Sequence, residues 1–213
     1  MKVVTFLYDE QIQVGVISDD EKHVVPANKF ANMEDLMENS SFEELMSIKR
    51  LATAAVDLRD VKILSPIPEP KHDIICLGIN YKSHDKELPH SFDKEKIKER
   101  EVPVYFAKRV NRSVDPGGYV DGHFDVVKKL DYECELAVII GKEAKNVAEK
   151  DALDYIFGYT IVNDISARDL QTAHKQWYFG KSLDSFTPMG PCIVTADEFG
   201  FPPALKLTCK VNG

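Results

Sequence analysis

Short apolar runs separated by polar turns open the chain, and this pattern predicts a set of short strands. The predicted strands are Val3–Tyr8, Val14–Ile17, His23–Val25 and Val61–Leu64. Between the last two, Ser41 and Glu44 have the spacing of a capping box, and apolar residues then recur at helical intervals as far as Ala52. This pattern predicts a helix that begins after Ser41.

Three prolines follow within the stretch SPIPEPKHD. Proline stiffens and extends a chain, so this stretch predicts a linker between domains. We therefore expect a small N-terminal domain at 1–65, a proline-rich linker at 66–71 and a second domain at 72–213.

The second part again shows mostly strand patterns, with one short helical turn predicted at Asp151–Ile156. The predicted strands are Ile74–Leu77, Val104–Ala107, Glu133–Ile140 and Phe157–Asn163. The stretch 82–101 is the most charged in the chain and predicts a surface excursion. The whole pattern indicates a mainly β fold with some α, in the α+β class.

Near the end, Leu205, Leu207, Cys209 and Val211 alternate with polar residues, which predicts a half-buried strand. The sequence Asn212-Gly213 then predicts a hairpin turn. No second strand follows, so we expect the C-terminal strands of this domain to be missing from the chain.

Composition narrows the possible classes of protein. The chain has 213 residues, of which 44% are hydrophobic, and a net charge of -8, which argues against nucleic-acid binding as its main function. No stretch has the length and apolarity of a membrane span, and the acidic N-terminus is unlike a signal peptide. The four cysteines lack paired spacing, which favours reduced thiols in a cytoplasmic protein.

Glu133 and Glu135 lie two residues apart on one predicted strand, so their side chains share a face. Two like charges at the entrance to an apolar run repel each other, which indicates a cation between them. Asp164 closes the next apolar strand. Three carboxylates suit Mg²⁺, Mn²⁺ or Ca²⁺. Zinc prefers clusters of thiolate or imidazole ligands, and the sequence offers no such cluster here. The alternative is that the two glutamates are solvated surface residues.

Four motifs occur in order between Gly78 and Pro191: GINYKSHDKE, LDYECELAVIIGK, FGYTIVNDISARDLQ and GKSLDSFTPMGP. Together they resemble the fumarylacetoacetate hydrolase family, in particular bacterial two-domain members such as 2-hydroxyhepta-2,4-diene-1,7-dioate isomerases and acylpyruvases. The resemblance implies a mixed β-sheet roll as the catalytic domain, preceded by a small α+β domain. The family domain normally continues with further strands that carry a T-G-T-P-like segment.

The resemblance also implies roles for individual residues. Glu133, Glu135 and Asp164 match the family's ligands for Mg²⁺ or Mn²⁺, with Ca²⁺ as a third candidate. His84 and Glu87 match a pair that activates water in the hydrolytic members, although in a loop of this charge they could be solvated surface residues.

Lys181 matches a lysine near metal and substrate, where its charge could stabilise an enolate or a carboxylate. The further substrate-binding candidates are Gln171, Lys108, Arg168 and Thr187. Arg168 could instead form a structural pair with Asp169. The family usually has proline where this chain has Arg109, which is a second candidate for binding substrate carboxylates.

The implied function is that of a metal-dependent hydrolase or isomerase of small 2-oxo or 1,3-dioxo acids, of the acylpyruvate or hydroxymuconate type, acting through a metal-stabilised enolate. The same site could instead decarboxylate or tautomerise oxaloacetate, or dehydrate a 2-keto-3-deoxy sugar acid. An alternative of another class is a truncated, non-catalytic metal-binding domain. The expected partners are a small oxo-acid substrate and, by resemblance, a second copy in a homodimer; no nucleic acid or membrane is expected.

Overall fold

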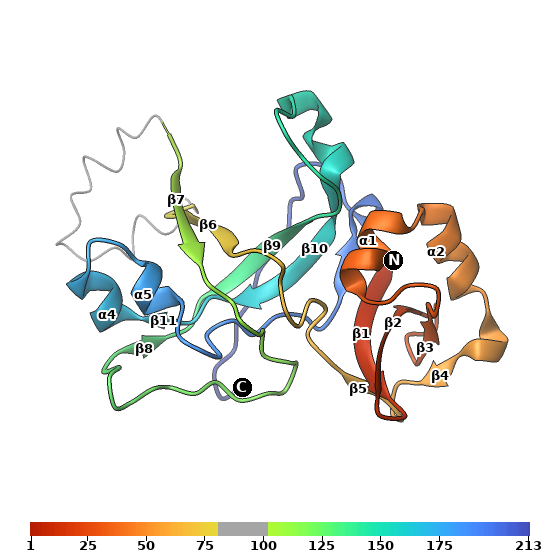
Figure 1. Ribbon diagram of the computed structural model, residues 1–213, viewed down its shortest axis with the longest axis horizontal. Coiled ribbons are helices and arrows are strands. Elements are labelled where there is room, and N and C mark those ends of the chain that lie inside the picture. Colours follow the sequence, from red (N-terminus) through yellow and green to blue (C-terminus); the bar gives the residue numbers. More distant parts are fainter. Residues whose placement is uncertain (81–101) are drawn as a thin grey trace.

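The computed structural model describes residues 1–80 and 102–213, and the charged stretch with His84 and Glu87 therefore lies outside the described residues. Strands predominate, and short helices lie around them (Figure 1). Within the described part, the helices are all too short or too polar to span a membrane. The fold is mainly β with some α, as the sequence pattern predicts.

The largest sheet has eight strands in the order β4-β3-β2-β1-β12-β10-β9, with β5 also paired to β1. Its members are β1 (Lys2–Tyr8), β2 (Gln11–Ile17), β3 (His23–Pro26), β4 (Val56–Asp57), β5 (Lys62–Ile63), β9 (Cys134–Ile140), β10 (Ile156–Asn163) and β12 (Ile193–Thr195). The pairings among these strands are antiparallel. All four strands predicted in the first part of the chain are confirmed, with bounds shifted by a few residues.

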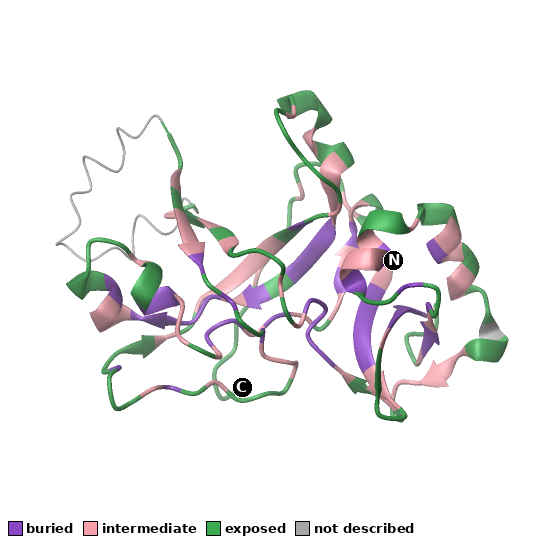
Figure 2. Cartoon of the chain, in the orientation of Figure 1, coloured by how far each residue is buried: buried purple, intermediate pink, exposed green. Residues whose placement is uncertain are grey.

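Two helices cover one face of the N-terminal strands, α1 (Met33–Asn39) and α2 (Phe42–Lys49). The Ser41 hydroxyl accepts a hydrogen bond from the Glu44 backbone N–H at 3.2 Å, which confirms the predicted helix start. The sequence pattern did not predict α1, although Asn32 caps it through the Asp35 N–H at 2.8 Å. The apolar sides of both helices close a core with the sheet (Figure 2).

The sheet continues from the N-terminal part into the second part of the chain. Val3 of β1 pairs with Ile193 of β12, and Tyr159 of β10 pairs with Val194. The predicted division into two domains stays a prediction. In the structure, strands from both predicted domains belong to one hydrogen-bonded sheet.

Two smaller ribbons complete the second part. One joins β6 (Ile74–Gly78) to β7 (Val104–Lys108), and the other joins β8 (Leu130–Asp131) to β11 (Ser166–Ala167). The helices α4 (Arg168–Ala173) and α5 (Tyr178–Lys181) lie beside them (Figure 1). A 3₁₀ segment, η3 (Glu149–Tyr155), takes the place of the predicted helical turn. Two further 3₁₀ turns are η1 (Ala52–Ala54) and η4 (Ala196–Glu198).

The prediction of a strand at 205–211 is wrong. This segment has no regular secondary structure, and its residues are exposed apart from a half-buried Leu207. It passes β9, where the Thr208 carbonyl lies 3.8 Å from the Cys134 thiol. Alternation alone does not make a strand, because the backbone also needs a neighbouring strand as a hydrogen-bonding partner, and the segment pairs with none in the described ranges.

Candidate active site

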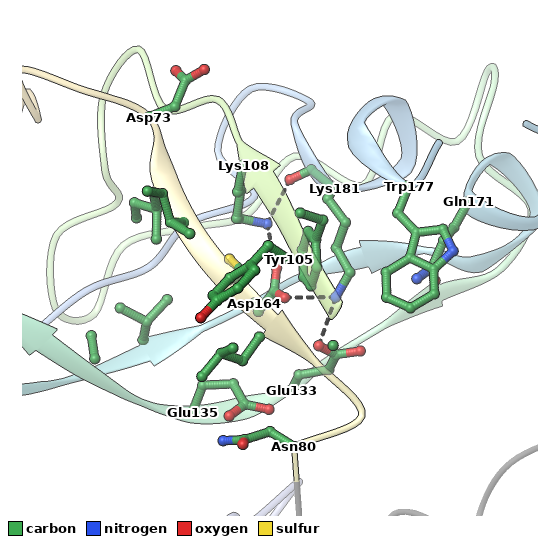
Figure 3. Close-up of a pocket in the computed structure, with 18 of the residues that line it drawn as sticks. Asp73, Asn80, Tyr105, Lys108, Glu133, Glu135, Asp164, Gln171, Trp177 and Lys181 are labelled. Carbon is green, nitrogen blue, oxygen red and sulfur yellow. Dashed lines mark hydrogen bonds and ion pairs between the residues drawn. The ribbon is translucent and has the colours of Figure 1, made fainter. Parts of the chain in front are cut away.

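A buried lysine joins two of the predicted metal ligands. The ammonium of Lys181 lies 2.6 Å from Glu133 Oε2 and 2.6 Å from Asp164 Oδ2, and the side chain is only 2% exposed (Figure 3). Lys181 is the last residue of α5, Glu133 immediately precedes β9, and Asp164 immediately follows β10. Glu133 thus contacts two positive groups, Lys181 and also Arg168 at 2.6 Å. The cation expected between Glu133 and Glu135 stays a prediction.

A second buried lysine lies on the other side of Asp164. Lys108 Nζ is 2.7 Å from Asp164 Oδ1, and it also donates to the carbonyl oxygens of Lys181 at 2.6 Å and Ile165 at 3.1 Å (Figure 3). Its side chain is 1% exposed. Asp164 is therefore held between two ammonium groups.

Arg168 closes the cluster on the side of β8. Its guanidinium contacts Glu133 Oε1 at 2.6 Å and Asp131 Oδ2 at 2.8 Å, and it donates to Gln171 Oε1 at 3.0 Å. The suggested Arg168–Asp169 pair is not formed. Asp169 instead accepts the backbone N–H groups of Lys128 and Lys129, which lie near its own helix start.

Backbone contacts bring these side chains together. The Asp164 N–H donates to the Glu133 carbonyl at 2.8 Å, and the Glu133 N–H donates to Asn163 Oδ1 at 3.0 Å, so the two acids are fixed at adjacent strand ends. Gly180 lets α5 approach α4 closely, because a Cβ at this position would lie 2.5 Å from the Gln171 nitrogen. This close approach places the next residue, Lys181, over the acids.

The electrostatics of the cluster keep Asp164 ionised. Burial alone would raise the pKa of Asp164, but the charges of Lys108 and Lys181 and their hydrogen bonds outweigh burial and lower the pKa below its usual value. Burial lowers the pKa of Lys108, and the neighbouring Asp164 charge opposes that shift. The acid and its two lysines thus stabilise one another in a site largely removed from water.

The cluster opens onto a cavity of about 1140 Å³. One wall is apolar and comes mainly from β6, β7 and β9, with Leu77, Tyr105 and Val138 among its residues. Trp177 and Gln171 line the cavity beside Lys181, and Glu135 and Asn80 line it near Glu133 (Figure 3). The cavity therefore joins a charged end to an apolar wall, as in many small-molecule sites.

The donor type at this site fits a divalent cation. Glu133, Glu135 and Asp164 all line the cavity, and carboxylate oxygens are the ligands that Mg²⁺ and Mn²⁺ prefer. Among the described residues, however, no three acidic, histidine or cysteine side chains are grouped closely enough to hold a metal. Lys181 occupies the position between Glu133 and Asp164, so these carboxylates would have to exchange this contact for a metal.

The other predicted residues divide between the cavity and its surroundings. Lys108, Gln171 and Arg168 line it, whereas Thr187 is buried outside the lining. Arg109 lies outside it as well and is exposed, with Asp73 at 3.9 Å and Asn111 as hydrogen-bond partner. His84 and Glu87 lie outside the described residues.

Sequence reasoning missed Asp131 as the partner of Arg168, and Trp177 and Lys129 as cavity residues. The LDYECE motif does contain Asp131, two residues before Glu133, and this position was the available signal for the acid. Nothing in the local sequence of Trp177 indicated its contact with the site.

The family model described as the C-terminal domain of fumarylacetoacetate (FAA) hydrolase matches residues 73–213. This match covers the ribbons, strands and helices that form the charged cluster. The chain belongs to the fumarylacetoacetate hydrolase family.

Individual relatives place the chain more closely. It is 44% identical over 163 residues to the oxaloacetate tautomerase YisK of Bacillus subtilis, an alignment that covers 76% of this chain and 52% of YisK. The chain thus matches about half the length of this curated relative.

Two solved structures share the fold. The fumarylacetoacetate hydrolase of Exiguobacterium antarcticum is 32% identical, with a TM-score of 0.72 over 94% of this chain and 68% of that one. The maleylpyruvate hydrolase of Sphingobium sp. SYK-6, in complex with manganese(II) and pyruvate, is 25% identical, with a TM-score of 0.66 over 95% of this chain and 70% of that one.

Proposed function

We propose that the protein acts on a small 2-oxo acid and moves a proton between carbon and oxygen, as a tautomerase or isomerase. One observation carries this proposal: the Lys181 ammonium, 2% exposed, lies between two carboxylates where the charged cluster meets the cavity. A cation so placed can stabilise the negative charge that develops on an enolate oxygen. The similarity to an oxaloacetate tautomerase supports the same reaction class.

The surrounding residues suggest how a substrate would be held. Gln171 already accepts a hydrogen bond from Arg168 through its amide oxygen, so its amide N–H₂ is the group available to donate to a substrate oxygen. The apolar wall with Leu77 and Trp177 would exclude water from the reacting carbon. A divalent cation held by Glu133, Glu135 and Asp164 would, when bound, polarise the two oxygens of a 2-oxo acid.

Hydrolysis of a C–C bond is the second candidate. The fold is shared with a maleylpyruvate hydrolase in complex with manganese and pyruvate, which supports both the metal and a 2-oxo acid ligand. In this case His84 and Glu87 are proposed to activate the attacking water. The two candidates share the cavity and Lys181, and they differ in whether a carbon–carbon bond breaks.

A substrate panel separates the two reactions. With Mg²⁺ or Mn²⁺ present, we expect faster loss of the ultraviolet absorbance of enol-oxaloacetate without release of pyruvate and CO₂. Cleavage of acylpyruvates, detected as released pyruvate, would instead favour the hydrolase. Lys181→Met should lower either rate by about 100-fold, the size of effect expected for a transition-state contact. A Lys181→Met protein with the wild-type rate would contradict the proposal.

The metal is tested independently of turnover. Electron paramagnetic resonance of Mn²⁺ should show binding to the wild type, tightened by oxalate, which mimics a planar enolate. Glu135→Gln should weaken this binding by at least tenfold, whereas Glu143→Gln, at an exposed position, should not change it. Equal Mn²⁺ affinity in both variants would exclude Glu135 as a ligand.

A further inference from the structure

The Lys108 ammonium is held by oxygens of three other residues. The structure surrounds it with three oxygens: the Lys181 carbonyl at 2.6 Å and the Ile165 carbonyl at 3.1 Å accept hydrogen bonds, and Asp164 Oδ1 at 2.7 Å is an ion-pair partner without hydrogen-bond geometry. At 1% exposure the side chain lies behind these oxygens. The polar contacts of the Lys108 ammonium therefore lie within the protein.

The three oxygens belong to different parts of the site. Lys108 itself ends β7, Asp164 and Ile165 follow β10, and Lys181 is the last residue of α5. The carbonyl groups in the last turn of a helix have no partner within the helix, and Lys108 supplies one to the carbonyl of Lys181. Lys108 thus ties the backbone of Lys181 and the side chain of Asp164 to the same strand end.

We propose that Lys108 is a positioning residue that acts through Lys181 and does not bind substrate. Its contacts hold the Lys181 backbone and Asp164 Oδ1 together, so that the Lys181 ammonium can reach Asp164 Oδ2 and Glu133 at 2.6 Å each. The Lys181 ammonium also lies 5.2 Å from the ring centroid of Phe106, which lies two residues before Lys108 in β7. The strand end of β7 therefore supports both the backbone and the charged end of Lys181.

Packing alone does not explain a lysine at this position. Burying an ammonium costs several kcal/mol unless its partners compensate, and a methionine would fill similar space without that cost. The contacts of the ammonium explain why a charged residue is present. It is one of the two cationic partners of Asp164, and it binds the carbonyl at the end of α5.

The kinetic test rests on the proposed function and uses a double-mutant cycle on the whole chain. Lys108→Met should lower kcat by about 10–100-fold, as is usual when a supporting contact is lost, with KM changed less than about twofold. The double variant with Lys181→Met should be no slower than Lys181→Met alone, because both changes remove one function. Lys150→Met, at an exposed lysine, should leave kcat and KM unchanged.

Two kinetic results would contradict the positioning role of Lys108. A rise in KM at constant kcat, or losses that multiply in the double variant, would show an independent contact of Lys108 with substrate and overturn the proposal. Lys108→Arg provides a second variant if Lys108→Met does not fold. It keeps the charge but not the three-point geometry, so positioning predicts a fall in kcat, whereas a role of charge alone predicts an unchanged rate.

A measurement without turnover separates this inference from the proposed function. In ¹H–¹⁵N spectra of lysine ammonium groups, the protected Lys181 signal should be visible in the wild type and should shift or broaden in Lys108→Met, but stay unchanged in Lys150→Met. An unchanged Lys181 signal in Lys108→Met would overturn the positioning role. Failure of every oxo-acid as a substrate would overturn only the proposed function.

Discussion

At the scale of single residues, the charged cluster depends on Asp164. We expect Asp164→Asn to lower the free energy of unfolding by roughly 3–5 kcal/mol, because it leaves two buried ammonium groups without their common counter-charge. Urea unfolding followed by circular dichroism measures the change. Asp154→Asn, at an exposed position, should change the stability by less than about 0.5 kcal/mol. Similar stabilities for the two variants would contradict the assigned role of the cluster.

Cys76, which lines the same cavity, should be an unreactive thiol. Burial, followed by the negative charge of Asp164, raises its pKa to about 12. Because only the thiolate reacts, about one molecule in ten thousand is reactive at pH 8. Peptide mass spectrometry after iodoacetamide treatment should show labelling of exposed Cys209 first, and labelling of Cys76 should increase steeply only as the pH approaches 12. Equal labelling of both at pH 8 would contradict this.

The sequence indicated which residues belong to the site, but not which of them contact each other. The strand pattern grouped Glu133 with Asp164, and the family resemblance added Lys181; these three side chains do meet. The expectation of a metal between the acids could not anticipate the lysine that lies there, because its place depends on how closely α5 approaches α4 at Gly180. The partner of Arg168 was missed for a similar reason, since Asp131 reaches it only through the β8–β11 pairing.

At the scale of elements, strands followed the sequence pattern better than helices did. The apolar runs of β1, β2, β9 and β10 were visible in the sequence, and these strands span seven or eight residues. The helices α4 and α5 have six and four residues, too few for a helical period to show. The wrong strand at 205–211 had the right period, but strand formation also required a partner elsewhere in the fold.

The close contact between β10 and β12 gives a test at this scale. A Cβ at Gly158 would lie 2.3 Å from the Val194 carbonyl oxygen and 2.8 Å from Ile193 Cγ2. Gly158→Ala should therefore separate the strands and lower the free energy of unfolding by about 1–3 kcal/mol. Gly200→Ala is the matched control, because no atom lies within 4 Å of its added Cβ and it should change stability little. Equal effects in thermal or urea unfolding would contradict the tight pairing.

At the scale of the whole molecule, one face of the β9–β10 pair carries neighbouring exposed apolar side chains. Leu136 pairs with Ile161 and Val138 with Tyr159, so these residues share a face of the sheet. On this face Tyr159 is buried and Leu136 is partly exposed. Val138 is 49% exposed and Ile161 50%. Contiguous apolar surface of this kind commonly marks an interaction site. We predict that a second copy of the chain covers it.

Sedimentation equilibrium tests this prediction. We expect a species of twice the 24.1 kDa chain mass at micromolar concentration. Ile161→Thr should weaken the association about tenfold, because at least ~1.5 kcal/mol of apolar burial is lost. Ile12→Thr makes the same change at a side chain that is 58% exposed on β2, away from this face, and should not alter the association. A monomer at all concentrations would rule out the dimer.

The pairing of β1 with β12 also has a consequence for biosynthesis. The Met1 amino group contacts the Thr195 hydroxyl across 194 positions of sequence, so the centre of the sheet has a very high contact order. At roughly 5–20 residues per second, translation would need about 10–40 s to make β12 after β1. During that time Lys2 and Val3 of β1 lack their partner strand, whereas Phe6 and Leu7 on the same edge can already pair with β5. Nascent chains should therefore depend on chaperones more than their modest length suggests.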